Sequence, residues 1–235
     1  GEKQLRVVKF ADNRSYLCAM NILDGKIAAE AVKAALKIQV AERPAAGKKI
    51  PHLAAILVGN NGASATYVAA KVKACEQTGF ISTLIRLEDN VTQQKLLETI
   101  RGLNQDPDVD GILVQLPLPA KISEQEVIDA IDPLKDVDGF HPHNIGRLAV
   151  RQPTLRSCTP FGVIKLLQAA NISLMGLDAV VVGVSNHVGR PMALELLLAG
   201  CTVTSCHRHT KDLAKAIMQA DLVIAAAGKP GLIKG

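Results

Sequence analysis

Two side chains that can exchange protons stand one helical turn apart in the first third of the chain. Tyr67 and Lys71 are four residues apart within the stretch 63–79, which predicts a helix closed by Gly79. They therefore lie on one helical face and can act in a single pocket. Short-chain dehydrogenases share this Tyr-x-x-x-Lys spacing, but their glycine-rich loop precedes the pair. Here the comparable loop follows it by more than 100 residues, which excludes that family.

Two further polar residues are candidates for the same site. Gln115 ends a predicted strand in V-Q-L-P-L-P, and Asp138 lies in K-D-V-D-G. Ligands of open α/β sheets bind outside the carboxyl ends of the strands, so both side chains could reach the cleft that holds Lys71. The spacing fits a structural alternative equally well, in which Gln115 caps the strand and Asp136 or Asp138 orders a turn before Gly139.

A loop in the second half has the form of a dinucleotide-binding turn. The predicted strand 179–182 runs into G-V-S-N-H-V-G-R-P and then into a helix. Gly183 can form the turn, and Gly189 lets the backbone approach a pyrophosphate. Pro191 suits the first helical turn, where backbone N–H groups attract an anion. Because the spacing is not G-x-G-x-x-G, a plain strand-to-helix connection is the alternative.

The next predicted strand ends in C-H-R-H-T, where an NAD-specific fold usually presents an acidic residue to the ribose. No Asp or Glu stands there. Arg208, assisted by His207 or Ser185, could instead pair with a 2′-phosphate, which favours NADP over NAD. The alternative is a solvent-exposed arginine between two surface histidines.

The composition is that of a folded globular protein of 235 residues, with 48% hydrophobic and 21% charged residues. The net charge of +5 comes from scattered Lys and Arg, and the aromatic residues are limited to 2 Tyr and 4 Phe. We therefore expect no nucleic-acid partner. The apolar runs 53–58, 179–184 and 222–227 are far shorter than the roughly 20 residues that cross a bilayer, so no membrane partner is expected either.

Cysteine usage indicates a reducing compartment. The five cysteines are odd in number and form no C-x-x-C pair, and we expect buried, reduced thiols in a cytoplasmic protein; they are Cys18, Cys75, Cys158, Cys201 and Cys206. Residues 1–19 carry no sustained periodicity and resemble an extension before a natural start at Met20. A transit peptide is the alternative, which Glu2 and Asp12 disfavour.

Hydrophobic periodicity predicts strands and helices in alternation. The predicted helices are 24–43, 63–79, 92–104, 123–131, 161–170, 191–200 and 211–220, and the predicted strands are 53–58, 80–87, 111–116, 178–183, 201–206 and 221–226. Such alternation implies parallel βαβ units. The segment 132–160 has little regular pattern and is expected to be a functional loop or connection. We expect two α/β lobes that meet near residues 140–160.

Six motifs occur in order and together carry a specific resemblance. They are G-A-S-A-T-Y-V-A-A-K-V-K-A-C, G-I-L-V-Q-L-P-L-P, K-D-V-D-G-F-H-P-x-N-I-G-R-L, C-T-P-F-G-V, V-G-V-S-N-H-V-G-R-P-M-A and A-A-G-K-P-G-L-I-K-G. Over about 23–235 the chain resembles the bifunctional methylenetetrahydrofolate dehydrogenase/methenyltetrahydrofolate cyclohydrolase family. The resemblance implies NADP-dependent oxidation of 5,10-methylenetetrahydrofolate and hydrolysis of the product to 10-formyltetrahydrofolate, by a homodimer.

The resemblance also assigns expected roles. Lys71 would handle the proton of the hydrolytic step, Gln115 would hydrogen-bond it, Tyr67 would stack on the folate rings, and Asp138 would accept hydrogen bonds from the pterin. The cofactor would be held by Gly183, Ser185, Gly189, Arg190 and Arg208. No metal is implied, because the cofactor carries the hydride chemistry.

The implied fold is α/β and two-lobed. A folate-binding catalytic domain would span residues 20–156, and a Rossmann-like parallel-sheet NADP-binding domain would span 157–235, with its C-terminal part apparently missing. Family members continue beyond the position of Gly235, so a truncated, non-catalytic folate- or nucleotide-binding module is an alternative. A related two-lobed enzyme, such as a shikimate-type or amino-acid dehydrogenase, is another. The sequence departs from the family at Val184, His187 and Ser157.

Overall fold

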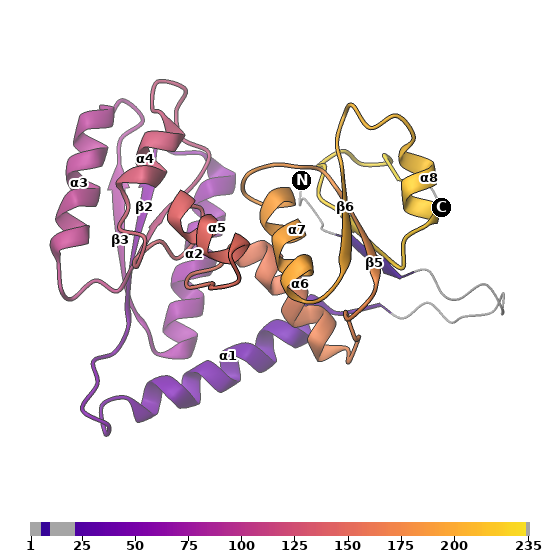
Figure 1. Ribbon diagram of the computed structural model, residues 1–235. Coiled ribbons are helices and arrows are strands. Elements are labelled where there is room, and N and C mark those ends of the chain that lie inside the picture. Colours follow the sequence, from indigo (N-terminus) through magenta and orange to yellow (C-terminus); the bar gives the residue numbers. More distant parts are fainter. Residues whose placement is uncertain (1–5, 10–21, 234–235) are drawn as a thin grey trace. The chain divides into compact units, whose positions relative to one another are not determined.

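The computed structural model describes residues 22–233 and the backbone of residues 6–9 (Figure 1). Tertiary contacts divide the chain into two compact units. The N-terminal unit is Gly25–Asn144, and the C-terminal unit is Ile145–Gly235 with the segment that precedes Gly25. The expected domain division at 156/157 stays a prediction. The predicted leader, residues 1–19, lies outside the described residues except for the backbone of 6–9.

The N-terminal unit alternates helices and strands as predicted. Its elements are α1 (Gly25–Glu42), β2 (His52–Val58), α2 (Gly62–Thr78), β3 (Ile81–Leu87), α3 (Gln93–Gln105), β4 (Gly111–Val114) and α4 (Glu124–Ala130). The strands form a parallel sheet in the order β3-β2-β4. Because β2 and β4 are parallel neighbours, their carboxyl ends lie at the same edge of the sheet.

Alternate residues of β2 build two cores, one on each face of the sheet. Ile56 packs with residues of α3 and α4, whereas Leu57 packs with Val68 of α2. This two-sided burial explains why the strand is a continuous apolar run, as is usual for central parallel strands. Helix α2 is thereby fixed against the sheet on the face opposite α3 and α4.

Local capping signals set the helix ends that the sequence predicts. Asn61 accepts hydrogen bonds from the backbone of Ala63 and Ser64 at the start of α2, and Gly79 ends that helix with a φ of 81°. Ser123 Oγ accepts a 3.4 Å hydrogen bond from Glu126 N at the start of α4. Such caps satisfy backbone groups that the helix itself leaves unpaired.

Helices of the C-terminal unit cover both faces of a second sheet. Its elements are α6 (Cys158–Ala169), β5 (Asp178–Val182), α7 (Gly189–Leu198), β6 (Thr202–Cys206), α8 (Leu213–Met218) and β7 (Leu222–Ala225). Strands β6, β5 and β7 are parallel, and β1 (Arg6–Lys9) pairs antiparallel with β7. Val181 packs with α6 and α7, and Val180 packs with α8. The expected α/β fold class is confirmed.

The expectation of little regular structure between 132 and 160 is wrong. Helix α5 (Pro142–Ala149) lies within this segment, and α6 begins at Cys158. Residue Asp136 also forms a parallel bridge with Ile112 of β4. The helix is short and contains Gly146, which disfavours helices, so the local pattern did not predict it.

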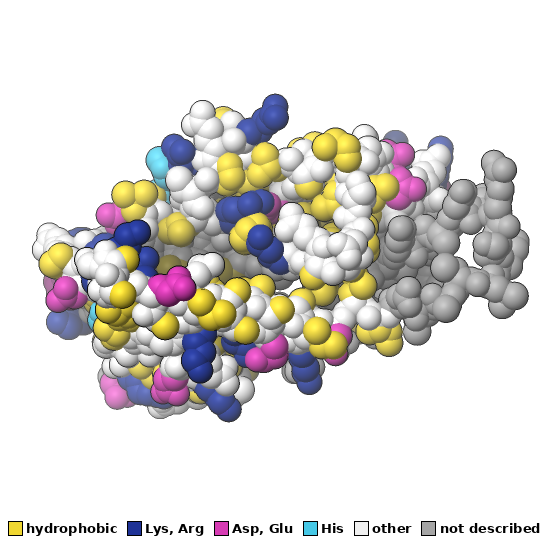
Figure 2. All heavy atoms as spheres, turned by 90° about the horizontal axis from the view of Figure 1, so that it is seen from below, with side chains coloured by type: hydrophobic (Ala, Val, Ile, Leu, Met, Phe, Trp, Pro, Cys, Tyr) yellow, Lys and Arg dark blue, Asp and Glu magenta, His cyan; other side chains and the backbone are white. Residues whose placement is uncertain are grey.

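Helix α1 is apolar around much of its circumference, and its side chains are mostly exposed. Ile27, Val32 and Ile38 are among the exposed large hydrophobic residues. Figure 2 shows hydrophobic side chains interspersed with charged ones on the face where α1 lies. Among the described residues, no helix combines the length and the apolar character needed to cross a membrane.

An ion pair with a buried carboxylate joins the segment just before α6 to α7 in the C-terminal unit. The Glu195 carboxylate is fully buried, and Arg156 Nε donates a 2.8 Å hydrogen bond to its Oε1. Arg156 Nη2 pairs with the other carboxylate oxygen, so the contact is bidentate. The guanidinium also lies 3.9 Å above the centre of the Phe161 ring. Both partners are thus held in one geometry.

Removing one partner of this pair should destabilise the fold more than removing both. We expect Arg156→Met to lower the free energy of unfolding by about 3–5 kcal/mol, because the Glu195 carboxylate stays buried without its partner. Urea denaturation measures this loss. The double variant Arg156→Met/Glu195→Met should recover most of it, since no buried charge remains; equal losses in the two variants would contradict this explanation.

The cysteines divide into buried and exposed thiols. Cys75, Cys201 and Cys206 are buried, and none of the four described cysteines forms a disulfide. The expectation that Cys158 is buried is wrong, because it stands exposed at the first position of α6. Cys18 lies outside the described residues. Burial raises the pKa of the Cys75 and Cys201 thiols, and the charge of Glu76 adds to this effect at Cys75.

Alkylation should follow this division. Brief treatment with iodoacetamide at neutral pH should modify Cys158 and leave Cys75 and Cys201 unmodified, because burial restricts access and the raised pKa lowers the thiolate fraction. Peptide mapping by mass spectrometry resolves each site. Equal labelling of Cys158 and Cys201 in the folded protein would contradict the structure.

Candidate functional site

The N-terminal unit brings together three of the residues that the sequence singled out. Lys71 lies on α2, which follows β2 directly, and Gln115 is the first residue after β4. Asp138 lies in the loop that runs parallel to β4 through the Ile112–Asp136 bridge. The sheet order places the ends of β2 and β4 side by side, and Gln115 N donates a 2.9 Å hydrogen bond to Ile56 O. The segments that carry Lys71, Gln115 and Asp138 therefore meet at one edge of the sheet.

The Lys71 ammonium stands between an amide oxygen and a carboxylate. Its Nζ is 3.5 Å from Gln115 Oε1 and 3.8 Å from Asp138 Oδ1. The Gln115 side chain is oriented by its own Nε2, which donates a 2.7 Å hydrogen bond to Leu116 O. Because the amide donates in that direction, its oxygen is turned towards the ammonium. The two oxygens fix the position of the ammonium, and an amine is a group that can give or take a proton.

The cluster remains open to an incoming molecule. The side chains of Lys71 and Asp138 are 38% and 19% exposed, and Tyr67, one turn earlier on α2, is 53% exposed. An exposed phenol ring offers a flat apolar face together with a hydroxyl. The arrangement thus combines a proton-transfer group, a carboxylate acceptor and a stacking surface.

The two carboxylates of the K-D-V-D-G segment have different surroundings. Asp136 is buried, and its Oδ2 accepts a 2.8 Å hydrogen bond from His141 N. Its main-chain oxygen accepts a 3.1 Å hydrogen bond from Gly139 N. The turn before Gly139 is therefore ordered by Asp136, whereas Asp138 faces Lys71. Of the structural alternatives, the turn-ordering role falls to Asp136.

In the C-terminal unit, the glycine-containing loop joins β5 to α7 in a tight turn. Gly183 has a φ of +116°, and a Cβ there would stand 2.6 Å from Ala226 O. A Cβ on Gly189 would stand 2.0 Å from Gly183 O. Both positions therefore exclude side chains. For Gly189 the excluded space is occupied by the loop itself, so this glycine lets the start of α7 pack on the end of β5.

Ser185 closes this loop. Its Oγ accepts 3.3 Å hydrogen bonds from Val188 N and Gly189 N, and its main-chain oxygen accepts a 3.0 Å hydrogen bond from Arg190 N. These contacts hold the first turn of α7, on which Arg190 is exposed. The start of a helix carries partial positive charge, so the loop presents a site for an anion.

Arg208 lies at the same edge of the second sheet. Strand β6, which precedes it, pairs with β5, and Gly183 N donates a 2.8 Å hydrogen bond to Cys206 O. The turn that carries Arg208 is closed by His207 N, which donates a 2.8 Å hydrogen bond to Thr210 Oγ1. Arg208 is exposed, and its Nε donates a 3.0 Å hydrogen bond to His209 Nε2. The turn therefore presents a guanidinium and has no acidic residue.

The sequence alone did not single out two residues that hold the Asp138 loop. Lys135 caps the end of α3, and Asn144 donates to the buried Asp136. Both lie in the stretch that was expected to be irregular. Both belong to the motif K-D-V-D-G-F-H-P-x-N-I-G-R-L, which was the available signal. Within residues 22–233, no group of three or more His, Cys, Asp or Glu side chains could hold a metal ion.

Two family models match the chain. Residues 23–138 match the tetrahydrofolate dehydrogenase/cyclohydrolase catalytic domain. Residues 157–235 match the tetrahydrofolate dehydrogenase/cyclohydrolase NAD(P)-binding domain. The first match contains the Lys71 cluster, and the second contains the glycine turn and Arg208.

Three similar proteins are bifunctional enzymes named FolD. The chain is 62% identical over 214 residues to the bifunctional protein FolD of Methylobacillus flagellatus, covering 91% of this chain and 74% of that protein. The crystal structure of FolD from Campylobacter jejuni is similar with a TM-score of 0.89 at 49% identity, covering 92% of this chain and 77% of that one. A Trypanosoma brucei FolD structure, complexed with NADP and an inhibitor, has a TM-score of 0.84 at 36% identity over 89% and 72% of the two chains.

Proposed function

The chain belongs to the tetrahydrofolate dehydrogenase/cyclohydrolase family, and we propose that Lys71, Gln115 and Asp138 form its reaction site. The protein is a bifunctional enzyme of one-carbon folate metabolism. It oxidises 5,10-methylenetetrahydrofolate with NADP and hydrolyses the resulting 5,10-methenyltetrahydrofolate to 10-formyltetrahydrofolate. The observation that carries our assignment is the Lys71 ammonium held between Gln115 Oε1 and Asp138 Oδ1.

The C-terminal unit fits the cofactor. Close packing at Gly183 and Gly189 places the start of α7 on the end of β5, and the partial positive charge of that helix start attracts a phosphate. We propose that this turn, with Ser185 and Arg190, holds the pyrophosphate and that Arg208 pairs with the 2′-phosphate. NADP, when bound, accepts the hydride from the methylene carbon.

We propose that Lys71 moves the proton in the hydrolytic step. Water attacks the electrophilic methenyl carbon, and its C–O bond forms as one proton leaves the water. Lys71 Nζ, in its neutral form, takes that proton. The bond between this carbon and the ring nitrogen then breaks, the hydroxyl loses its remaining proton as it becomes the formyl C=O, and the ring nitrogen gains one proton, so the step releases one proton in total, which Lys71 carries. Gln115 Oε1 holds the ammonium that results. The hydride step removes no proton from water, so it depends less on Lys71.

We propose that Asp138 and Tyr67 bind the folate. The pterin has several N–H donors, and a carboxylate can accept two at once. Asp138 is half-buried, which strengthens such hydrogen bonds relative to a fully hydrated carboxylate. Tyr67 is exposed on the same helical face as Lys71 and offers its ring to the folate.

We propose a cytoplasmic homodimer. Support for the dimer comes from the family resemblance, and support for the compartment comes from the described cysteines, none of which forms a disulfide. The family matches in both units argue against a non-catalytic module and against a shikimate-type or amino-acid dehydrogenase.

Replacing Lys71 should separate the two activities. Lys71→Met keeps the length of the side chain and removes the base, so we expect the cyclohydrolase rate to fall by roughly 10²–10⁴-fold and the dehydrogenase rate to fall less. The absorbance of methenyltetrahydrofolate follows both reactions. Lys73→Met, an exposed lysine on the same helix, is the matched control. A folded Lys71→Met variant with an unchanged cyclohydrolase rate would refute the assignment.

Replacing Arg208 should change the cofactor preference. A charge-assisted contact to the 2′-phosphate contributes about 1.5–3 kcal/mol, so Arg208→Ala should lower the NADP/NAD ratio of kcat/KM by roughly 10- to 150-fold. Lys211→Ala removes an exposed charge three residues later and should leave the ratio unchanged. If the ratio is the same in Arg208→Ala and the wild type, another cation holds the phosphate.

A further inference from the structure

The loop that carries Asp138 is fastened on both sides of that residue. We propose that the buried Asp136 is the positioning residue that holds Asp138 beside Lys71 and in place for the folate. The inference rests on the proposed role of Asp138 in folate binding. It assigns Asp136 no contact with the substrate.

The sheet fixes the beginning of the loop. Ile112 N of β4 donates a 2.7 Å hydrogen bond to Lys135 O, and Ile112 and Asp136 form a parallel bridge. Val137 packs so closely on the strand that a Cβ on Gly111 would stand 2.4 Å from Val137 Cγ1. The backbone immediately before Asp138 therefore runs as a short extension of the sheet.

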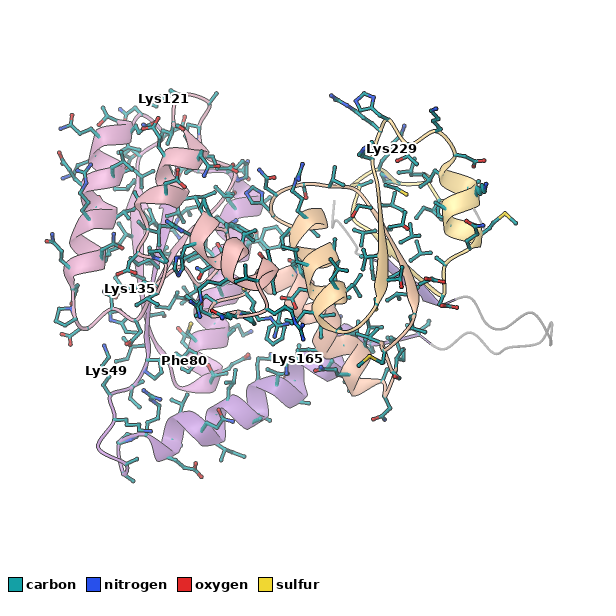
Figure 3. All side chains as sticks on the ribbon, viewed as in Figure 1. Lys49, Phe80, Lys121, Lys135, Lys165 and Lys229 are labelled. Carbon is teal, nitrogen blue, oxygen red and sulfur yellow. The ribbon has the colours of Figure 1, made fainter. Side chains whose placement is uncertain are left out.

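Lys135 attaches the same segment to the end of α3. Its Nζ donates to Leu103 O, Asn104 O and Asp106 O at 3.0, 2.8 and 2.7 Å. Figure 3 labels Lys135 among the side chains of the N-terminal unit. The three donors of the ammonium meet two carbonyl oxygens in the last turn of α3 and that of Asp106, the residue that follows the helix. Because all three contacts go to main-chain atoms, Lys135 acts as a clamp between α3 and the loop.

Asp136 fixes the part of the loop that follows Asp138. Its Oδ2 accepts hydrogen bonds from His141 N at 2.8 Å and from Asn144 Nδ2 at 3.0 Å. Asp136 and Asn144 are only 2% and 1% exposed. Asn144 Nδ2 also donates to Pro133 O at 2.9 Å. The carboxylate thus joins residues on both sides of Asp138 across a closed turn.

Burying the Asp136 carboxylate costs free energy of folding, because the charged group must be removed from water. Here its acceptor oxygen holds two donors that come later in the chain than Asp138. The Asp138 carboxylate is consequently set 3.8 Å from Lys71 Nζ by a loop with little freedom. Small displacements of a binding group reduce activity strongly, by about 100-fold for roughly 1 Å. Loss of the Asp136 contacts should therefore displace Asp138 and weaken folate binding.

The test compares Asp136→Ala with Asp136→Asn. The Ala variant loses the acceptor and should weaken binding of 5-formyltetrahydrofolate, measured by calorimetry, by roughly 10- to 100-fold. Its KM for folate should rise in both reactions with a smaller change in kcat, and its Kd for NADP should be unchanged. The Asn variant keeps an acceptor oxygen of the same size and should stay within about threefold of the wild type.

Asp132→Ala is the matched control. Asp132 lies in the same segment, and its Oδ1 accepts a 2.8 Å hydrogen bond from Leu134 N. It does not connect the two sides of Asp138, so folate affinity should be unchanged. Should Asp136→Ala fail to fold, Asn144→Ala removes one of the two donors and should weaken folate binding while Asp132→Ala does not.

Asp138→Ala distinguishes this inference from the proposed function. If Asp138→Ala binds folate normally, the role of Asp138 fails and the role of Asp136 fails with it. If Asp138→Ala loses folate binding while folded Asp136→Ala or Asn144→Ala keeps it, only the positioning role of Asp136 is overturned. Loss of folate affinity in Asp138→Ala and Asp136→Ala, with recovery in Asp136→Asn, supports both.

Discussion

The site of the N-terminal unit depends on one interaction, an ammonium held between an amide oxygen and a carboxylate. Lys71 alone on a helix surface would be an ordinary solvated lysine. Gln115, turned by its hydrogen bond to Leu116 O, and Asp138, presented by a fastened loop, give that ammonium a fixed position. The three residues come from a helix, a strand end and a loop, so the sheet that aligns these elements is what makes the interaction possible.

The two aspartates of the K-D-V-D-G segment show how one short motif serves both structure and chemistry. They are two residues apart, yet Asp136 is buried among main-chain and amide donors while Asp138 stays accessible. Residues two apart on an extended strand would point to the same side. The turn closed by the hydrogen bond from Gly139 N to Asp136 O is what gives the two carboxylates different surroundings. One carboxylate therefore stabilises the loop, and the other remains available to a ligand.

The candidate site of the C-terminal unit depends on two glycine positions where no side chain fits. Where α7 begins on the end of β5, the main chain occupies the space that a Cβ of Gly183 or Gly189 would need. Ser185 then closes the loop with its hydroxyl and carbonyl oxygens. The resulting turn presents a helix start to an anion, and Arg208 stands at the same edge of the sheet. Such a site needs few specific side chains, which suits a cofactor with charged phosphates.

The sequence by itself determined most helices, strands and motifs, because helix caps, glycine turns and hydrophobic periodicity act over a few residues. The ends of α2 at Asn61 and Gly79 are examples. Only the tertiary structure decided which aspartate orders the turn, that Cys158 is exposed, and that 142–149 forms a helix. The Lys71–Gln115 and Arg156–Glu195 contacts join residues 44 and 39 positions apart. Contacts over such separations depend on how the sheets pack, and no local pattern encodes them.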